Sequence, residues 1–169
     1  KAILQCLGEH GHAVHDSNEL AERVRVALRR KICFNLTDGK PLLFLYQLDP
    51  SLQDLFHNSV RQNANGAYLS MDAESIDLVV KAAQKEIGKL PPTAQRPAIV
   101  TDKEIRRFVK RVLSRDFPDL QVISYEEVAP EMNVQLLGKI GEAAGAQIGQ
   151  GTSWNGEQSM IATLPSVAR

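Results

Sequence analysis

Three histidines, His10, His12 and His15, lie close together in the sequence and are followed by Asp16. Imidazole and carboxylate groups bind zinc and other transition metals, so this cluster is where the sequence could offer a metal site. The spacing of the cluster matches no established zinc motif. We therefore expect a solvated loop between two helices, with no bound metal.

The chain lacks the short motifs that carry nucleophilic catalysis or phosphate binding. It has no G-x-S-x-G elbow, no P-loop and no dinucleotide fingerprint, and no lysine follows residues 149–151, which read Gly-Gln-Gly. Glu126 and Glu127 would point to opposite faces of an extended segment, which is a poor arrangement for shared acid–base chemistry. We expect neither enzymatic activity nor a cofactor, and a small α/β enzyme of unknown substrate stays open as an alternative.

Basic side chains gather on one predicted helix, over residues 102–117. An apolar stripe from Ile105 to Phe117 would face the core, so the basic side chains would form a ridge toward solvent. A ridge of this kind suits an acidic protein surface or, as an alternative, nucleic-acid phosphates. Nucleic-acid binding lacks support from interleaved aromatic residues that could stack on bases. The basic ridge consists of Lys103, Arg106, Arg107, Lys110, Arg111 and Arg115.

The bulk composition favours no charged partner and bounds the size of the fold. Of the 169 residues, 20 are Lys or Arg and 20 are Asp or Glu, so any electrostatic attraction must come from local patches. A chain of this length with 43% hydrophobic residues can bury one moderate core with a helical appendage. Cys6 and Cys33 lie in apolar contexts, which predicts buried thiols in a reducing compartment.

Apolar periodicity predicts a series of amphipathic helices. Each of those that begin within the chain starts at a residue that can cap it, because Asp, Ser and Thr side chains accept hydrogen bonds from free backbone amides. The predicted helices span residues 1–7, 16–32, 50–61, 72–88 and 102–117, with Asp16 or Ser17, Asp49, Asp72, and a capping box of Thr101 and Glu104 at the starts of the last four.

Strand signals complete the predicted fold. Asp38-Gly39 separates apolar residues 33–36 from residues 42–48, which is typical of an antiparallel β-hairpin. Residues 98–100 predict an inner strand, and residues 120–125 follow the basic helix as another, so this part predicts a right-handed parallel crossover. We therefore expect an α/β (α+β) fold: a small mixed sheet with a β-hairpin and a parallel β-α-β crossover, flanked by helices and preceded by a short helical segment.

Two segments resemble the export-gate family of bacterial type III secretion systems. Residues 96–111 read RPAIVTDKEIRRFVKR and residues 117–127 read FPDLQVISYEE, similar to the strand, arginine-rich helix and Ser-Tyr-Glu-Glu strand end of that family's last subdomain. Residues 16–33 resemble the family's helix that leads into the hairpin, and residues 48–52 its Leu-Asp-Pro turn. Residues 141–169 depart from the usual ending.

The resemblance implies a domain organisation and a location. Family members carry an N-terminal membrane domain and a cytosolic part of four subdomains, which assembles into a nonameric ring. Residues 1–32 would be the end of the helical third subdomain, residues 33–140 the α/β fourth subdomain, and residues 141–169 a C-terminal extension with one more strand before it at 133–140. The chain would then be a soluble fragment at the cytoplasmic face of the bacterial inner membrane, attached there through the absent membrane domain.

The resemblance also implies partners. The ring docks chaperone–substrate complexes, gatekeepers and other export-apparatus proteins for ordered export, and the basic helix resembles the virulence branch more than the flagellar one. We expect no nucleic acid among these partners. From charge and helix geometry, the residues expected to bind partners are Arg106, Arg107, Lys110 and Arg111, and those expected at subunit contacts are Arg23, Arg29 and Arg30.

Overall fold

The computed structural model of the chain describes residues 1–12, 16–64, 66–89 and 97–141. The expectations for His15 and for residues 142–169 of the extension lie outside the described residues. Within the described ranges, no helix is long and apolar enough to cross a membrane.

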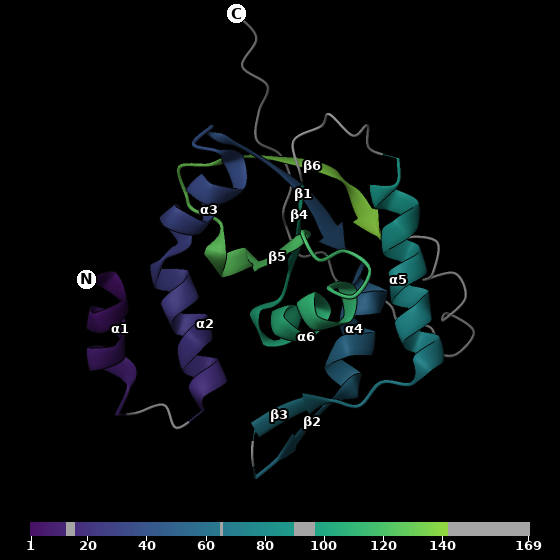
Figure 1. Ribbon diagram of the computed structural model, residues 1–169, viewed down its shortest axis with the longest axis horizontal. Helices are drawn as coiled ribbons and strands as arrows, with labels where there is room; N and C mark the ends of the chain where they lie inside the picture. The colour runs from purple at the N-terminus through teal and green to yellow at the C-terminus, as the bar shows by residue number, and fades with distance from the viewer. Residues whose placement is uncertain (13–15, 65, 90–96, 142–169) are drawn as a thin grey trace, which may run out of the picture.

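Among the described residues, four parallel strands form the central sheet in the order β5-β4-β1-β6 (Figure 1). Strands β1 (Leu42–Leu48) and β4 (Ala98–Thr101) are the inner strands, whereas β5 (Gln121–Ser124) and β6 (Asn133–Ile140) are the edges. All four residues of β4 are buried, as expected of an inner strand with a continuous apolar run. The parallel pairing of β4 with β5 around one helix confirms the predicted crossover.

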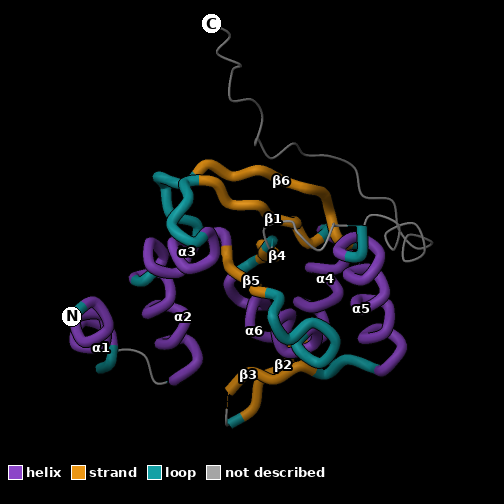
Figure 2. The backbone as a smooth tube through the Cα atoms, turned by 45° about the horizontal axis from the view of Figure 1, so that its top comes forward, coloured by secondary structure: helices purple, strands orange, loops and turns teal. Residues whose placement is uncertain are grey.

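Helices cover both faces of this sheet (Figure 2). One face packs against α4 (Pro50–Ser59), α5 (Ala73–Ile87) and α6 (Lys103–Leu113), and this layer holds the larger apolar cluster. The other face packs against α3 (Arg29–Thr37) and holds a smaller cluster. Successive strand residues alternate between the two clusters, because neighbouring side chains in a strand point to opposite faces. The fold class is therefore the predicted α/β arrangement.

Three predicted caps are confirmed. Asp16, Asp49 and Asp72 each accept a hydrogen bond from a backbone amide in the first turn of the helix that follows. Such a bond satisfies one of the amides that a helix start leaves free. The amide hydrogen bond also lowers the pKa of Asp16 and of Asp72 below the ordinary value.

The predicted capping box at the start of α6 is absent. Asp102 is the N-cap, and no described side chain forms a cap hydrogen bond there. Thr101 is fully buried in β4, where its hydroxyl donates to Gln53 Oε1 at 3.4 Å. Thr101 is the last residue of β4, and its side chain points into the core, so it is not available to cap α6.

The hairpin predicted around Asp38-Gly39 is wrong. Residues 33–36 belong to α3, and β1 pairs in parallel with β4 and β6. Asp38 has φ 51° and Gly39 has φ 80°, so the pair ends a helix in the left-handed conformation that a hairpin turn would also use. The hairpin of this fold lies elsewhere, as β2 (Val60–Asn63) and β3 (Gly66–Leu69) in a separate two-stranded sheet.

The predicted helix over residues 16–32 is two helices. α2 (Ser17–Ala27) ends at Leu28, which is at once its C-cap and the N-cap of α3. Leu28 has φ −97° and ψ 8°, outside the helical region. Before them, α1 (Ala2–His10) packs against α2 at the edge of the molecule.

Strand β6 confirms the strand expected at 133–140 and ends against α4. Its pairing with β1 shifts after Leu136, which leaves Leu137 as an extra residue at a bulge. Gly141, with φ 102°, follows the strand in contact with Leu52, and a Cβ there would collide with the leucine side chain. Only glycine meets both conditions.

The core assignment predicts how two phenylalanines differ. Phe56 is fully buried, whereas Phe34 is 62% exposed. We expect Phe56→Ala to lower the free energy of unfolding by about 3–5 kcal/mol, because it leaves a cavity in the larger cluster. The matched change Phe34→Ala should cost less than about 1 kcal/mol. Urea unfolding followed by circular dichroism measures both, and equal losses would contradict this assignment of the core.

Candidate functional site

Arg106 points into the molecule, not toward solvent. Its residue exposure is 9%, and its guanidinium binds Glu22 of α2 through two hydrogen bonds, Nε to Oε2 at 2.8 Å and Nη2 to Oε1 at 2.5 Å. The expectation that Arg106 lies on a solvent-facing ridge is therefore wrong. Arg106 precedes the buried Leu113 by two helical turns, so both lie on nearly the same side of α6.

Four residues form what we call the charge cluster: Glu22, Arg25, Arg106 and Glu127. Glu127, which is 0% exposed, lies 3.4 Å from Arg106 Nε through Oε1 and 2.6 Å from Arg25 Nη2 through Oε2. Burial disfavours the charged guanidinium of Arg106, but hydrogen bonds and ion pairs to Glu22 and Glu127 outweigh it and raise the pKa of Arg106. The charge cluster thus joins α2 and α6 to the turn after β5.

Local structure fixes the position of Glu127. It ends η1 (Tyr125–Glu127), a 3-10 turn whose N-cap is Ser124. Ser124 donates to Glu127 Oε1 from both its amide and its hydroxyl, at 3.3 Å each. The Cys33 thiol donates to the Glu127 carbonyl oxygen at 3.3 Å. Contacts from Ser124 and Cys33 therefore hold Glu127 in addition to its ion pairs with Arg25 and Arg106.

No motif in the sequence marks Glu22 or Glu127 as a partner of Arg106. Both are glutamates, a residue type that is almost never fully buried unless paired. One signal was present: Glu22 lies between Leu20 and Val24 of the apolar stripe, close to the buried side of α2. Its partner lies 84 positions later in the sequence, which no local pattern reveals.

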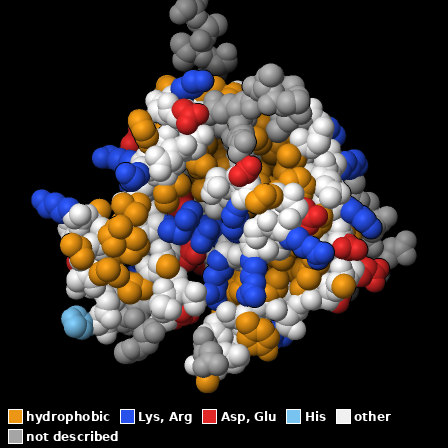
Figure 3. Space-filling model, in the orientation of Figure 1, with side chains coloured by type: hydrophobic (Ala, Val, Ile, Leu, Met, Phe, Trp, Pro, Cys, Tyr) orange, Lys and Arg blue, Asp and Glu red, His pale blue; other side chains and the backbone are white. Residues whose placement is uncertain are grey.

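The other side chains of the basic ridge differ in their contacts, and Lys103 binds the Glu126 carboxylate. Arg107 Nη2 donates to the Ala67 carbonyl of β3 at 2.8 Å, and Lys110 Nζ donates to the Leu120 carbonyl at 2.6 Å. Arg111 and Arg115 are exposed. Figure 3 shows Lys and Arg side chains gathered over the middle of one face, where α6 lies. Carbonyls are neutral, so Arg107 and Lys110 keep their net charge.

The three arginines expected at subunit contacts lie on two helices, because the chain breaks at Leu28. Arg23 on α2 is exposed and binds Glu19 at 2.9 Å. Arg30 on α3 is exposed and binds Glu131 at 2.8 Å, whereas Arg29 is half-buried. Exposed pairs of this kind stabilise a fold little, so both arginines remain accessible to another protein.

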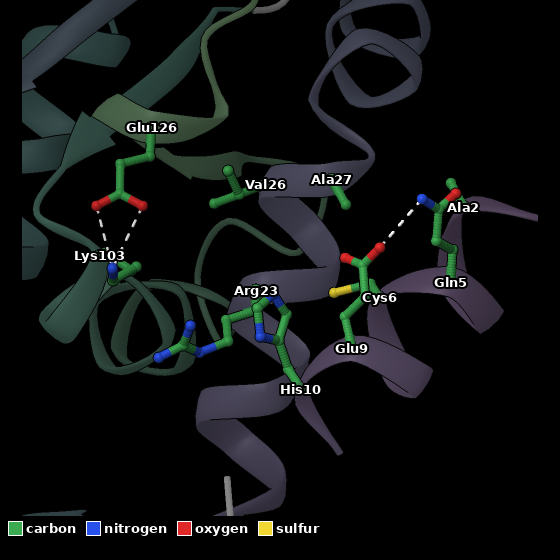
Figure 4. A pocket seen from close by; sticks show the side chains of 10 residues that line it. All are labelled: Ala2, Gln5, Cys6, Glu9, His10, Arg23, Val26, Ala27, Lys103 and Glu126. Atoms are coloured by element: carbon green, nitrogen blue, oxygen red, sulfur yellow. Dashed lines mark hydrogen bonds and ion pairs between the residues drawn. The ribbon is translucent and has the colours of Figure 1, made fainter. Parts of the chain in front are cut away.

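A hollow of about 530 Å³ lies between the helices α1 and α2 and the start of α6 (Figure 4). On one wall Lys103 binds Glu126 at 3.1 Å, and on the other lie Cys6, Glu9 and His10 of α1. A smaller hollow of about 340 Å³ lies where Arg25 of α2 meets α3 and the start of β5. It is lined by Arg25, Ile32, Asn35, Leu36 and Gln121.

The predicted histidine cluster is only partly described. His10 lines the larger hollow and His12 is exposed, whereas His15 lies outside the described residues. In the described ranges, no three His, Cys, Asp or Glu side chains form a group that could hold a metal.

The two thiols should differ in reactivity. Both thiols are buried, as predicted, but Cys6 is 6% exposed at the wall of the larger hollow, whereas Cys33 is 1% exposed in the smaller apolar cluster, where burial raises the pKa of its thiol. We expect a disulfide reagent at pH 8 to label Cys6 in the folded chain and to label Cys33 only in denaturant, because the reactive thiolate is scarce at Cys33. Cys6→Ala and Cys33→Ala variants separate the two rates, and rapid labelling of Cys6→Ala without denaturant would contradict this.

Comparison with known proteins extends over most of the chain. The model of the FHIPEP family matches residues 1–133. Low calcium response locus protein D of Yersinia pestis is 29% identical over 140 residues, which are 83% of this chain and 20% of that protein. The chain therefore spans about one fifth of the length of that relative.

Two solved structures are similar to this chain in both fold and sequence. The Chlamydia pneumoniae CdsV protein, in a structure of the CdsV and CdsO complex, is 34% identical with a TM-score of 0.75, covering 82% of this chain and 41% of that one. Nonameric EPEC SctV-C is 28% identical with a TM-score of 0.73, again covering 82% of this chain and 41% of that one.

Proposed function

Because the chain belongs to the FHIPEP family, we propose that it is a cytosolic part of a type III secretion export gate that docks chaperone–substrate complexes for ordered export. Two similar proteins support this role: CdsV has been solved in complex with CdsO, and SctV-C is nonameric. The exposed ion-pairing groups among the described side chains suit reversible binding of a charged partner.

We propose the domain organisation that the resemblance implied. Residues 1–32 end the third subdomain, residues 33–140 form the fourth, and residues 141–169 are an extension. Helix α3 crosses the first boundary, and the nearest break in the chain is Leu28. The full protein would be held in the bacterial inner membrane by another part, with this part on the cytoplasmic side, in a virulence system.

The docking face that we propose is the outer side of α6. The observation that carries it is the pair Arg111, in the last turn of α6, and Arg115, in the turn just after the helix, both exposed and in no ion pair with another described residue. Arg107 and Lys110 add charge beside them, whereas Arg106 supports the helix from within. Unpaired surface cations attract carboxylates of a partner and speed its encounter, while each contributes modestly to affinity. This suits a partner that must be released to a channel.

Charge reversal at Arg111 tests the docking face. We expect Arg111→Glu to weaken binding of a chaperone–substrate complex from the same bacterium about tenfold, since one attractive contact becomes repulsive, equivalent to about 1.4 kcal/mol. Isothermal titration calorimetry measures the dissociation constant. Arg30→Glu is the matched control, because it changes an exposed arginine on α3, on the opposite face of the sheet, and should bind as the original chain does. If Arg111→Glu and Arg30→Glu bind the complex with equal affinity, the docking face is not the outer side of α6.

The contacts between subunits that we propose lie at Arg23, Arg29 and Arg30. Their test is Arg30→Glu in the complete protein, where we expect a clear loss of nonamers in sedimentation velocity. The Arg30–Glu131 pair is exposed, so its loss should change folding stability by less than about 1 kcal/mol. Here Arg111→Glu is the control and should leave the ring intact. A ring that survives Arg30→Glu would exclude this arginine from the contact.

A further inference from the structure

Helices α1 and α2 contribute no residue to either apolar cluster of the described chain, and the one buried hydrophobic side chain on them is Cys6 of α1. Neither the larger nor the smaller cluster contains a residue from Ala2–His10 or Ser17–Ala27. Within the described part of α2, the one buried residue is Glu22, a carboxylate. The contact between these helices and the α/β unit therefore lacks the apolar burial that holds most helices in place.

Charged groups hold α2 instead. Glu22 and Arg25, on the inner side of α2, bind Arg106 and Glu127 of the α/β unit in the charge cluster. At the other end of α2, the carboxylate of Asp16 lies beside Gly66 of the hairpin turn, close enough to Arg107 for the cation to lower the pKa of that carboxyl. These contacts join polar groups along the length of the helix.

Two hollows border the joint between α2 and the α/β unit. The hollow of about 530 Å³ has Arg23, Val26 and Ala27 of α2 among its walls, and the hollow of about 340 Å³ has Arg25. Arg25 Nε is buried with no hydrogen-bond partner among the described residues. Protein interiors are close-packed and pair their buried hydrogen-bond donors. The contact between α2 and the α/β unit, which leaves a buried donor unpaired, therefore differs from a contact within a core.

The chain also has a suitable pivot. Leu28 separates α2 from α3 with non-helical dihedral angles. On the far side of Leu28, α3 is anchored by Cys33 in the smaller cluster. A few residues at the end of an element are enough to absorb a rigid-body rotation.

We infer that the charge cluster is a clasp: α1 and α2 swing away together about Leu28 when it opens, and the α/β unit stays folded. Opening exposes charged groups that water can solvate, and it removes no residue from either apolar cluster. A buried ion pair stabilises little relative to the solvated state, because its attraction is offset by the loss of water. Regions with few buried apolar contacts open at lower free energy than the core does.

If the proposed function holds, the clasp also regulates it. Arg23 and Arg30, proposed for subunit contacts, lie on opposite sides of the Leu28 pivot, while Arg111, proposed for docking, lies on the helix that carries Arg106. Opening of the clasp would therefore change the angle between the face of α2 in the ring and the docking face. This consequence rests on the proposed function, whereas the clasp itself does not.

Hydrogen–deuterium exchange of the full chain, read by mass spectrometry, tests the clasp without any partner. Glu22→Gln removes the charge that binds Arg106, and the matched control Glu19→Gln removes a carboxylate from the exposed side of the same helix. We expect Glu22→Gln to raise exchange of α1 and α2 amides at least about tenfold, because isolated helices of this length are marginal. Exchange in β1 and β4 should stay unchanged, and Glu19→Gln should match the original chain.

A second variant distinguishes opening of the clasp from general unfolding of the chain. Glu22→Met/Arg106→Met replaces the ion pair by apolar contact and should return α2 to the original exchange or slower. Exchange that rises equally in β1 and β4, or that fails to rise in α2, would overturn the clasp. So would a double variant that exchanges as fast as Glu22→Gln. None of these outcomes depends on ring assembly or docking, so the clasp can fail while the proposed function stands.

Discussion

A guanidinium withdrawn from water must find carboxylates, and this requirement at Arg106 arranges much of the molecule. Glu22 brings α2 against α6, and Glu127 brings the turn after β5 to the same point. Removing one member would leave a buried charge without its partner, which is far more costly than never burying it. The cluster therefore specifies the orientation of α2 while adding little net stability.

Several parts of the fold follow from local chemistry, and these were predictable. Asp49-Pro50 and Asp72 place helix starts because a carboxylate bonds free amides and proline already has a helical φ. The apolar run at residues 98–100 predicted an inner strand because only a strand buried on both faces lacks alternation. Family resemblance over residues 96–111 then connected these elements to a known fold.

The rest depended on contacts that a local pattern cannot contain. Asp38-Gly39 accepts the left-handed conformation equally in a hairpin and at a helix end, and only the pairing of β1 with strands far along the chain decides between them. Arg106 lies at the border of its helix's apolar stripe, and its direction is decided by Glu22 on another element. Whether the arginines proposed for docking and assembly bind anything likewise depends on partners outside the chain.

The position of β1 has a consequence for synthesis on the ribosome. Leu42 and Leu45 of this inner strand pair with Asn133 and Leu136 of β6, and Leu45 also pairs with Ala98 of β4. Both neighbours emerge long after β1 itself, so a nascent chain carries an apolar strand with two unsatisfied edges until β4 is made, and with one until β6 completes nearly all of the described residues. Distant pairing of this kind slows folding and exposes the chain to aggregation meanwhile. A general folding chaperone that shields β1 during elongation would therefore influence yield more than one that acts on the finished chain.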